Sequence, residues 1–218
     1  MTTTNDNAAR LAAAMARLPL VAILRGLQPH EASAIGHALE DAGFAMIEVP
    51  LNSPQPFDSI ATLRRELSRD TLVGAGTVRG LDDVQRLKDI GADLVVTPHA
   101  DIAVIRAAKA AGMLCVPGVA TPTEAFAALD AGADALKLFP AELVTHGVMK
   151  AMRAVLPASV PLLPVGGIVP ASLAPWRLAG ASGFGLGSAL YAPGTDAATV
   201  ARRAADFVNA WRDCSAAG

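Results

Sequence analysis

A lysine interrupts an apolar run that has the length and composition of a buried strand. Lys137 lies within ALKLFP at 135–140, on the same face of the expected strand as Ala135 and Phe139. Burial lowers the pKa of a lysine because the charged form loses water, and a neutral amine is a nucleophile for carbonyl carbons. The alternative is a lysine paired with a buried carboxylate for structure alone. Because lysine is rarely fully buried, we favour the nucleophile.

Other polar residues interrupt or end similar runs. Glu48 lies in MIEVPL at 46–51, on the face that also holds Met46. A carboxylate and an amine that share one interior form an acid–base pair or, alternatively, a buried salt bridge. Arg25 follows VAIL and Thr77 follows VGAG. Arginine binds carboxylates through two parallel hydrogen bonds and threonine adds a hydroxyl donor, so these residue types suit a carboxylate ligand.

Two glycine-rich segments indicate an anion site. PVGG ends at Gly166 and Gly167, and GLGS ends at Gly187 and Ser188. Backbone N–H groups without side chains around them bind phosphate well, and α/β barrels often bind phosphate after their seventh and eighth strands. The alternative is glycine retained for close packing. Two such segments on neighbouring expected strands favour phosphate.

The elements that carry these residues follow a repeating βα pattern. Helix-like stretches end at a glycine, and an apolar strand begins two or three residues later. These glycines are Gly43, Gly91, Gly112, Gly132 and Gly180. Continuous apolar runs are typical of parallel strands buried on both faces. Eight strands are expected, at 21–25, 46–51, 72–78, 94–98, 113–119, 135–140, 162–167 and 183–190.

Eight strands alternating with helices predict an α/β fold, a TIM (βα)8 barrel formed by residues 1–218 as one domain. An extra N-terminal helix is expected at 8–17, and the last helix from about 196 to 213. The clearest helix start is TPTE at 121–124, which has the residues of a capping box with proline at the first helical position. Active sites of such barrels lie at the C-terminal ends of the strands.

Composition narrows the function classes. The net charge of the 218 residues is −2, and no run of like charges suggests nucleic acid or a membrane surface as partner. No apolar stretch reaches about 18 residues, and the N-terminus lacks a signal-peptide pattern. Neither the two cysteines, Cys115 and Cys214, nor the four histidines have metal-ligand spacing. We expect a cytoplasmic protein that acts on small molecules with no metal and no cofactor.

These residues and motifs together resemble the family of 2-keto-3-deoxy-6-phosphogluconate and 6-phosphogalactonate aldolases. The resemblance runs from VAILRG to FVNAW. Its motifs are AILRG at 22–26, IEVPLNSP at 47–54, VGAGTV at 73–78, VVTP at 95–98, LKLFPA at 136–141, PVGG at 164–167 and GLGSALY at 185–191. It implies a class I aldolase in which Lys137 forms the Schiff base and Glu48 transfers protons. It also implies a homotrimer.

The resemblance further implies which residues bind substrate. Arg25 and Thr77 would hold the pyruvate carboxylate, with Phe139 and Val165 beside the reacting carbons, and Gly166, Gly167, Gly187 and Ser188 would bind the phosphate. Val165 stands where phosphogluconate members often carry threonine, and Asn52 stands where many carry arginine. These departures favour 2-dehydro-3-deoxy-6-phosphogalactonate, cleaved to pyruvate and D-glyceraldehyde 3-phosphate.

Three alternatives remain open at this stage. The chain could prefer the phosphogluconate epimer or cleave both epimers. A phosphosugar epimerase would need metal-binding side chains or two acidic residues at the strand ends. A non-catalytic phosphate-binding barrel would keep the glycines but would have no use for a buried lysine.

Overall fold

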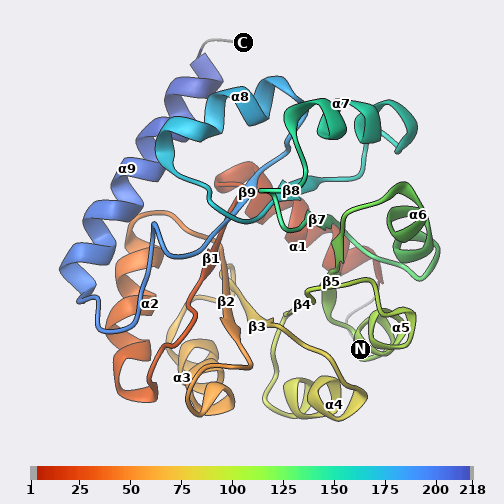
Figure 1. Ribbon diagram of the computed structural model, residues 1–218. Helices are drawn as coiled ribbons and strands as arrows, with labels where there is room; N and C mark the ends of the chain where they lie inside the picture. The colour runs from red at the N-terminus through yellow and green to blue at the C-terminus, as the bar shows by residue number, and fades with distance from the viewer. Residues whose placement is uncertain (1–3, 217–218) are drawn as a thin grey trace.

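The computed structural model, which describes residues 4–216, places parallel strands at the centre and helices around them (Figure 1). The strands are β1 (Leu20–Ile23), β2 (Met46–Pro50), β3 (Leu72–Gly76), β4 (Leu94–Val96), β5 (Leu114–Val116), β6 (Gly118–Val119), β7 (Leu136–Leu138), β8 (Leu162–Pro164) and β9 (Phe184–Leu186). The helices are α1 (Thr4–Arg17), α2 (Ala32–Asp41), α3 (Pro56–Glu66), α4 (Leu81–Asp89), α5 (Ile102–Ala110), α6 (Pro122–Asp130), α7 (His146–Val155), α8 (Leu173–Leu178) and α9 (Ala197–Ala216), with 3-10 turns at Pro29–Glu31 and Pro170–Ser172.

The strands form two parallel sheets that curl around a common interior. One sheet has the order β5-β4-β3-β2-β1-β9 and the other the order β6-β7-β8. The strand expected at 113–119 is divided into β5 and β6 at Pro117, which has no N–H group for strand pairing. At the other junction, an isolated parallel bridge joins Val165 to Gly185. The fold is therefore α/β, with a curled parallel sheet covered by helices.

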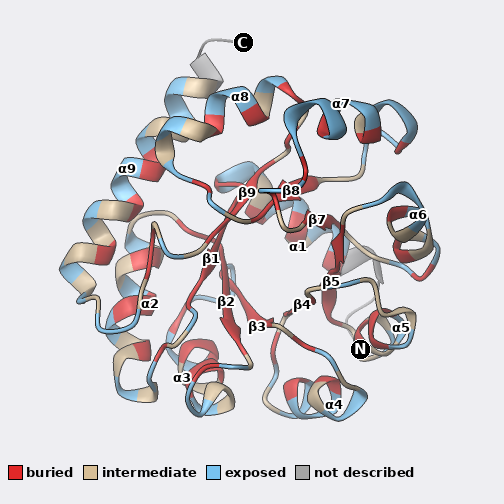
Figure 2. Ribbon diagram, viewed as in Figure 1, coloured by how far each residue is buried: buried red, intermediate tan, exposed pale blue. Residues whose placement is uncertain are grey.

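Side chains of each strand alternate between an outer layer under the helices and an inner layer enclosed by the strands. Leu136 and Leu138 belong to the outer hydrophobic layer, whereas Ala135 belongs to the inner one. In the same way, Ile47 belongs to the outer layer and Met46 to the inner one. Figure 2 shows buried residues along the strands and on the helix faces that cover them. The expected inward direction of Lys137 and Glu48 follows from this alternation.

Helix α1 closes the interior at the N-terminal ends of the strands. Its Leu11 and Ala14 pack with residues at the starts of several strands, and Figure 1 shows the helix behind them. Arg10 of this helix forms an ion pair with Asp93 at 2.7 Å. The expected extra helix is thus present, although it begins at Thr4 rather than at residue 8. The opposite, C-terminal end of the interior is left for a ligand.

The local signals for element ends are largely confirmed. The backbone is left-handed at all five glycines expected to end helices, which are Gly43, Gly91, Gly112, Gly132 and Gly180. The capping box at Thr121 and Glu124 forms as expected. The expected strand at 183–190 is shorter, because the chain leaves the sheet after Leu186. Among residues 4–216, no helix is long and apolar enough to cross a bilayer.

Candidate active site

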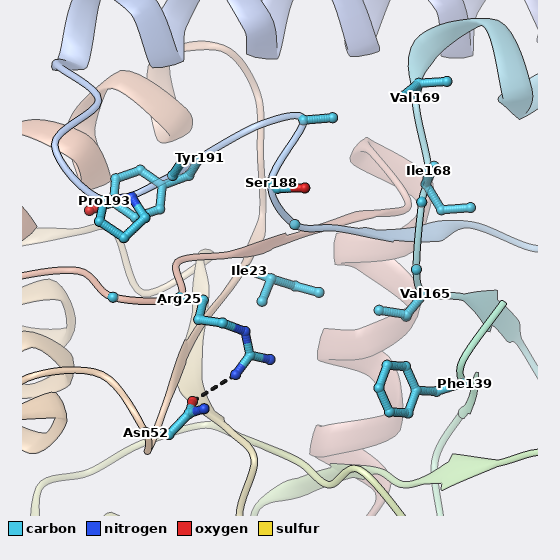
Figure 3. A pocket seen from close by; sticks show the side chains of 16 residues that line it. Ile23, Arg25, Asn52, Phe139, Val165, Ile168, Val169, Ser188, Tyr191 and Pro193 are labelled. Carbon is cyan, nitrogen blue, oxygen red and sulfur yellow. Dashed lines mark hydrogen bonds between the residues drawn. The ribbon is translucent and has the colours of Figure 1, made fainter. Parts of the chain in front are cut away.

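Two neighbouring cavities lie in the interior enclosed by the strands. The upper cavity, at the C-terminal strand ends, has a volume of about 470 Å³ and is shown in Figure 3. The lower cavity has a volume of about 20 Å³, is lined by Glu48 and Lys137, and has room for roughly one water molecule. Ile23 and Val165 line both cavities and therefore lie at the boundary between them. The two ionisable side chains singled out from the sequence thus line one small cavity next to the larger one.

Lys137 is held in this interior by the middle of β7. Its Cα is in register with those of Gly118 and Leu163 on the two neighbouring strands, and only 6% of the residue is exposed. Burial lowers the pKa of the Lys137 amine, the negative charge of Glu48 opposes this shift, and Arg25 adds to it. A lysine whose pKa is lowered in this way has a larger neutral fraction near pH 7, as a nucleophile requires.

Glu48 projects from β2 into the same interior and is 2% exposed. Burial raises the pKa of its carboxyl group, and the positive charges of Lys137 and Arg25 oppose this shift. Its Oε2 atom has no hydrogen-bond partner among the described residues. None of the ion pairs in residues 4–216 joins Glu48 to Lys137. The carboxyl group is therefore free to accept or donate a proton to a molecule placed between the two side chains.

Arg25 follows β1 and reaches the upper cavity from its rim. Its Nη1 atom donates a hydrogen bond of 2.7 Å to Oδ1 of Asn52, which follows β2 and lines the same cavity (Figure 3). Beneath them, the backbone N–H of Gly26 donates to Oγ of the buried Ser53 at 2.9 Å. These two contacts fix the loops after β1 and β2 relative to each other. The guanidinium is thereby held beside the cavity, where a ligand carboxylate could bind it.

Thr77 directly follows β3, yet it lines neither cavity. Its φ angle is +57°, a left-handed conformation that is strained for a β-branched residue. The residue is half-buried, and its hydroxyl group has no hydrogen-bond partner among the described residues. Strained backbone of this kind is concentrated at functional sites. The structure thus does not bring Thr77 into the lining of either cavity, and its residue type gives no sign of the strained backbone.

The glycine-rich segments form one wall of the upper cavity. Gly166, Gly167, Gly187 and Ser188 all line it. Gly166 and Gly167 have φ angles of +127° and +59°, which glycine adopts without steric cost. Among the described residues, the N–H groups of Gly167 and Ser188 donate no backbone hydrogen bond. These free donors make the wall suitable for an anion such as phosphate.

Sequence reasoning did not identify much of the cavity lining. Except for Ile23 on β1, the missed residues lie in loops that follow strands. They are Ile23, Gly26, Ile168, Val169, Ala189, Tyr191, Ala192 and Pro193. Tyr191 is buried, and its hydroxyl donates to Oε2 of Glu31 at 3.2 Å. Loops have no periodicity from which such positions can be read. Four of the eight carried a signal, because Ile23 and Gly26 lie in AILRG and Ala189 and Tyr191 lie in GLGSALY.

The site offers no set of metal ligands. Within residues 4–216, no group of three or more histidine, cysteine, aspartate or glutamate side chains is arranged to hold a metal ion. Val165 lines both cavities, and Phe139 lines the upper one together with the glycines. The arrangement is an apolar pocket with an amine and a carboxyl group at the base, an arginine at the rim and free N–H groups on one wall. It can form a covalent adduct with a carbonyl compound and bind an anion at its other end.

Comparisons with known proteins agree with this geometry. Residues 11–202 match the family model described as KDPG and KHG aldolase. The 2-dehydro-3-deoxy-6-phosphogalactonate aldolase of Escherichia coli strain K12 is 47% identical over 197 residues, which is 90% of this chain and 96% of that protein. A protein of Rhizobium meliloti named as a probable aldolase of the same substrate is 48% identical over 186 residues, covering 85% and 88% of the two chains.

Solved structures give the same result. A structure described as native KDPGal has a TM-score of 0.90 and 46% identity, and the match covers 92% of this chain and 97% of that one. The 2-keto-3-deoxy-6-phosphogluconate aldolase of Zymomonas mobilis ATCC 29191 has a TM-score of 0.80 and 26% identity, covering 90% and 95% of the two chains. Similarity is thus greater to the phosphogalactonate relatives than to this phosphogluconate one.

Proposed function

The chain belongs to the KDPG and KHG aldolase family, and we propose that it cleaves 2-dehydro-3-deoxy-6-phosphogalactonate to pyruvate and D-glyceraldehyde 3-phosphate through a Schiff base on Lys137. The observation that carries this proposal is the pairing of a buried amine of lowered pKa with a buried carboxyl group in one cavity. Such a pair has a direct use in imine chemistry, and it has none in a protein that only binds phosphate.

The proposed reaction begins with attack of the neutral Lys137 amine on the C2 ketone. Loss of water from the adduct gives a protonated imine, which withdraws electrons from C3. When the C4 hydroxyl loses its proton to Glu48, directly or through one water molecule in the lower cavity, the C3–C4 bond breaks and its electrons form an enamine. Glyceraldehyde 3-phosphate leaves. A proton then adds to C3, and hydrolysis of the imine releases pyruvate and the free amine.

The rest of the pocket would orient the substrate along the cavity axis. Arg25 would bind the carboxylate next to C2. Thr77 would also bind it, after a movement that brings its hydroxyl group to the cavity. The wall formed by Gly166, Gly167, Gly187 and Ser188 would bind the phosphate on C6, at the other end of the substrate. Phe139 and Val165 would contact the carbon atoms between these two ends.

The choice of epimer rests on the relatives and on Val165. The two phosphogalactonate relatives are 47–48% identical to this chain, whereas phosphogluconate aldolases such as that of Treponema pallidum are 31% identical over 155 residues. The test is to measure kcat/KM for both epimeric phosphates with the purified protein. We expect the phosphogalactonate to be cleaved at least as well as its epimer. A strong preference for phosphogluconate would overturn the substrate but leave the aldolase assignment intact.

We also propose that residues 1–218 form one closed eight-stranded (βα)8 barrel. In this reading β5 and β6 are one strand bent at Pro117, and the Val165–Gly185 bridge joins the last two strands. Backbone hydrogen bonds from Lys137 to Pro117 and from Asp134 to Cys115 support continuity at the bend. Slow amide hydrogen exchange at the bridge would be expected. Rapid exchange there would indicate an open edge instead.

Assembly and location are further proposals. We expect a homotrimer in the cytoplasm. A match that covers 92% of this chain is part of a designed cage described as a fusion of symmetric oligomeric domains. Analytical ultracentrifugation of the purified protein tests the trimer directly, and a monomeric or dimeric mass would contradict it.

A further inference from the structure

Gly76, the last residue of β3, lies against the carboxyl group of Glu48. A Cβ atom built on residue 76 would lie 2.1 Å from Oε2 and 2.7 Å from the carboxyl carbon of Glu48. Separations under 3.0 Å are essentially never seen for real Cβ atoms. No residue other than glycine can therefore occupy this position while the Glu48 carboxyl group stays where it is.

The backbone gives no other reason for glycine at this position. Gly76 is not among the residues with positive φ, so its conformation is open to any L-amino acid. Glycine inside a strand weakens it, because it adds unfolded-state entropy and has no side chain to pack. The three atoms nearest to the added Cβ all belong to the Glu48 carboxyl group. What the missing side chain provides is space for that carboxyl group.

Gly74, two residues earlier on the same strand, has a different role. A Cβ there would lie 1.8 Å from the backbone oxygen of Leu94 on β4. That glycine is needed for two backbones to approach each other. Gly74 is in register with Glu48, so Gly76 is the diagonal neighbour of Glu48 on the same face of the sheet. Only the second of the two glycines contacts the carboxyl group.

The oxygen that faces Gly76 is also the atom of Glu48 without a hydrogen-bond partner among the described residues. A buried oxygen without a partner is destabilising, and an N–H or hydroxyl donor nearby would remove that cost. A glycine, which brings no donor, leaves Oε2 unbonded and available for a proton. We propose that Gly76 is a positioning residue, whose missing side chain sets the place of the Glu48 carboxyl group and keeps Oε2 available for proton transfer.

This inference rests on the proposed role of Glu48 in the aldol cleavage. A methyl group at residue 76 would displace the carboxyl group by an ångström or more. A misplacement of about 1 Å can lower turnover roughly a hundredfold. Imine formation at Lys137 does not need this placement. The Gly76→Ala variant should therefore still form an imine with pyruvate and turn over slowly.

The experiment is a double-mutant cycle of Gly76→Ala and Glu48→Asp, with kcat, KM and borohydride trapping of pyruvate measured for each protein. Aspartate is shorter by one methylene group, so its carboxyl group is withdrawn from residue 76. We expect Gly76→Ala to lower kcat about a hundredfold in the wild type, with KM and the trapped fraction within about threefold, but to lower kcat less than about fivefold in the Glu48→Asp protein. An equal loss in both backgrounds, or no loss in the wild type, would overturn the inference.

Two further measurements keep the result interpretable. Gly147→Ala, at an exposed position of α7 with nothing closer than 3.7 Å to its added Cβ, is the matched control and should leave kcat unchanged. If Gly76→Ala does not fold, the inference predicts that adding Glu48→Asp restores the melting temperature, and a double variant that is equally unstable would contradict it.

The Glu48→Gln variant separates the two proposals. If it proves fully active, Glu48 has no role in proton transfer. If Glu48→Gln is inactive while Gly76→Ala is active, only the positioning role of Gly76 fails.

Discussion

The Nζ atom of Lys137 lies 4.7 Å from the centroid of the Phe139 ring. An aromatic face attracts a cation by about 0.5–2 kcal/mol. In the proposed mechanism the cation that matters is the protonated imine, so this contact would stabilise the intermediate from which the C3–C4 bond breaks.

Phe139→Leu should therefore lower kcat/KM by roughly 2- to 30-fold, because leucine preserves apolar burial but has no aromatic face. The same change should lower the pKa of Lys137 further, since the protonated amine loses a favourable contact. The pH dependence of borohydride trapping should shift to lower pH. Unchanged kinetics and an unchanged trapping profile would show that the ring only fills space.

Glu48→Gln should lower turnover by roughly a hundred- to ten-thousandfold, the usual size of general acid–base catalysis. The charge of Glu48 raises the pKa of Lys137, so its removal should lower that pKa and move imine formation with pyruvate to lower pH. Stopped-flow turnover and trapping between pH 5 and 10 (about one point per half unit) measure both effects. Normal turnover would make Glu48 only a structural partner of the lysine.

Val165 is 8% exposed and lines both cavities, so it is close to the carbons that react. Its side chain cannot form a hydrogen bond, and the two epimers differ in the direction of one hydroxyl group. Val165→Thr should move the kcat/KM ratio toward phosphogluconate by about 1–2 kcal/mol, or roughly five- to thirtyfold. Val165→Ala, which removes bulk without adding a hydroxyl, is the control and should not produce this shift in ratio.

Thr77→Gly separates the strain of the left-handed backbone from the use of the hydroxyl. That conformation costs an L-residue about 1–2 kcal/mol, and glycine adds about 0.5–1 kcal/mol of entropy to the cost of folding. The free energy of unfolding should stay the same or rise by up to about 1.5 kcal/mol, while KM for the substrate increases. Thr77→Ser should keep KM close to wild type. A less stable Thr77→Gly protein with normal KM would show that Thr77 stabilises the fold and does not bind the substrate.

The sequence was sufficient to find the base of the pocket. In a strand buried on both faces, an ionisable residue is costly, and the period of two tells which neighbours share its direction. Lys137 and Glu48 were placed inside on these grounds, and the structure has them lining one cavity. The glycine segments were found because backbone groups without side chains form recognisable short motifs.

The remaining features depend on contacts between strands and loops that no single segment encodes. The role of Gly76 needs the register of β2 against β3, which neither strand encodes alone. The lining by Ile168 and Pro193 comes from loops that fold back over the pocket. The left-handed backbone of Thr77 runs against its own residue type, so local propensity gives no sign of it.

The central claim is that Lys137 forms a covalent imine with the substrate, and the most direct measurement is borohydride reduction in the presence of pyruvate followed by peptide mass mapping. The account predicts a reduced pyruvyl group on the peptide that contains Lys137. In Lys137→Arg, which should keep the fold at some cost in stability, neither this adduct nor turnover above roughly a thousandth of wild type should remain. An adduct on another lysine, or an active Lys137→Arg protein, would contradict the account.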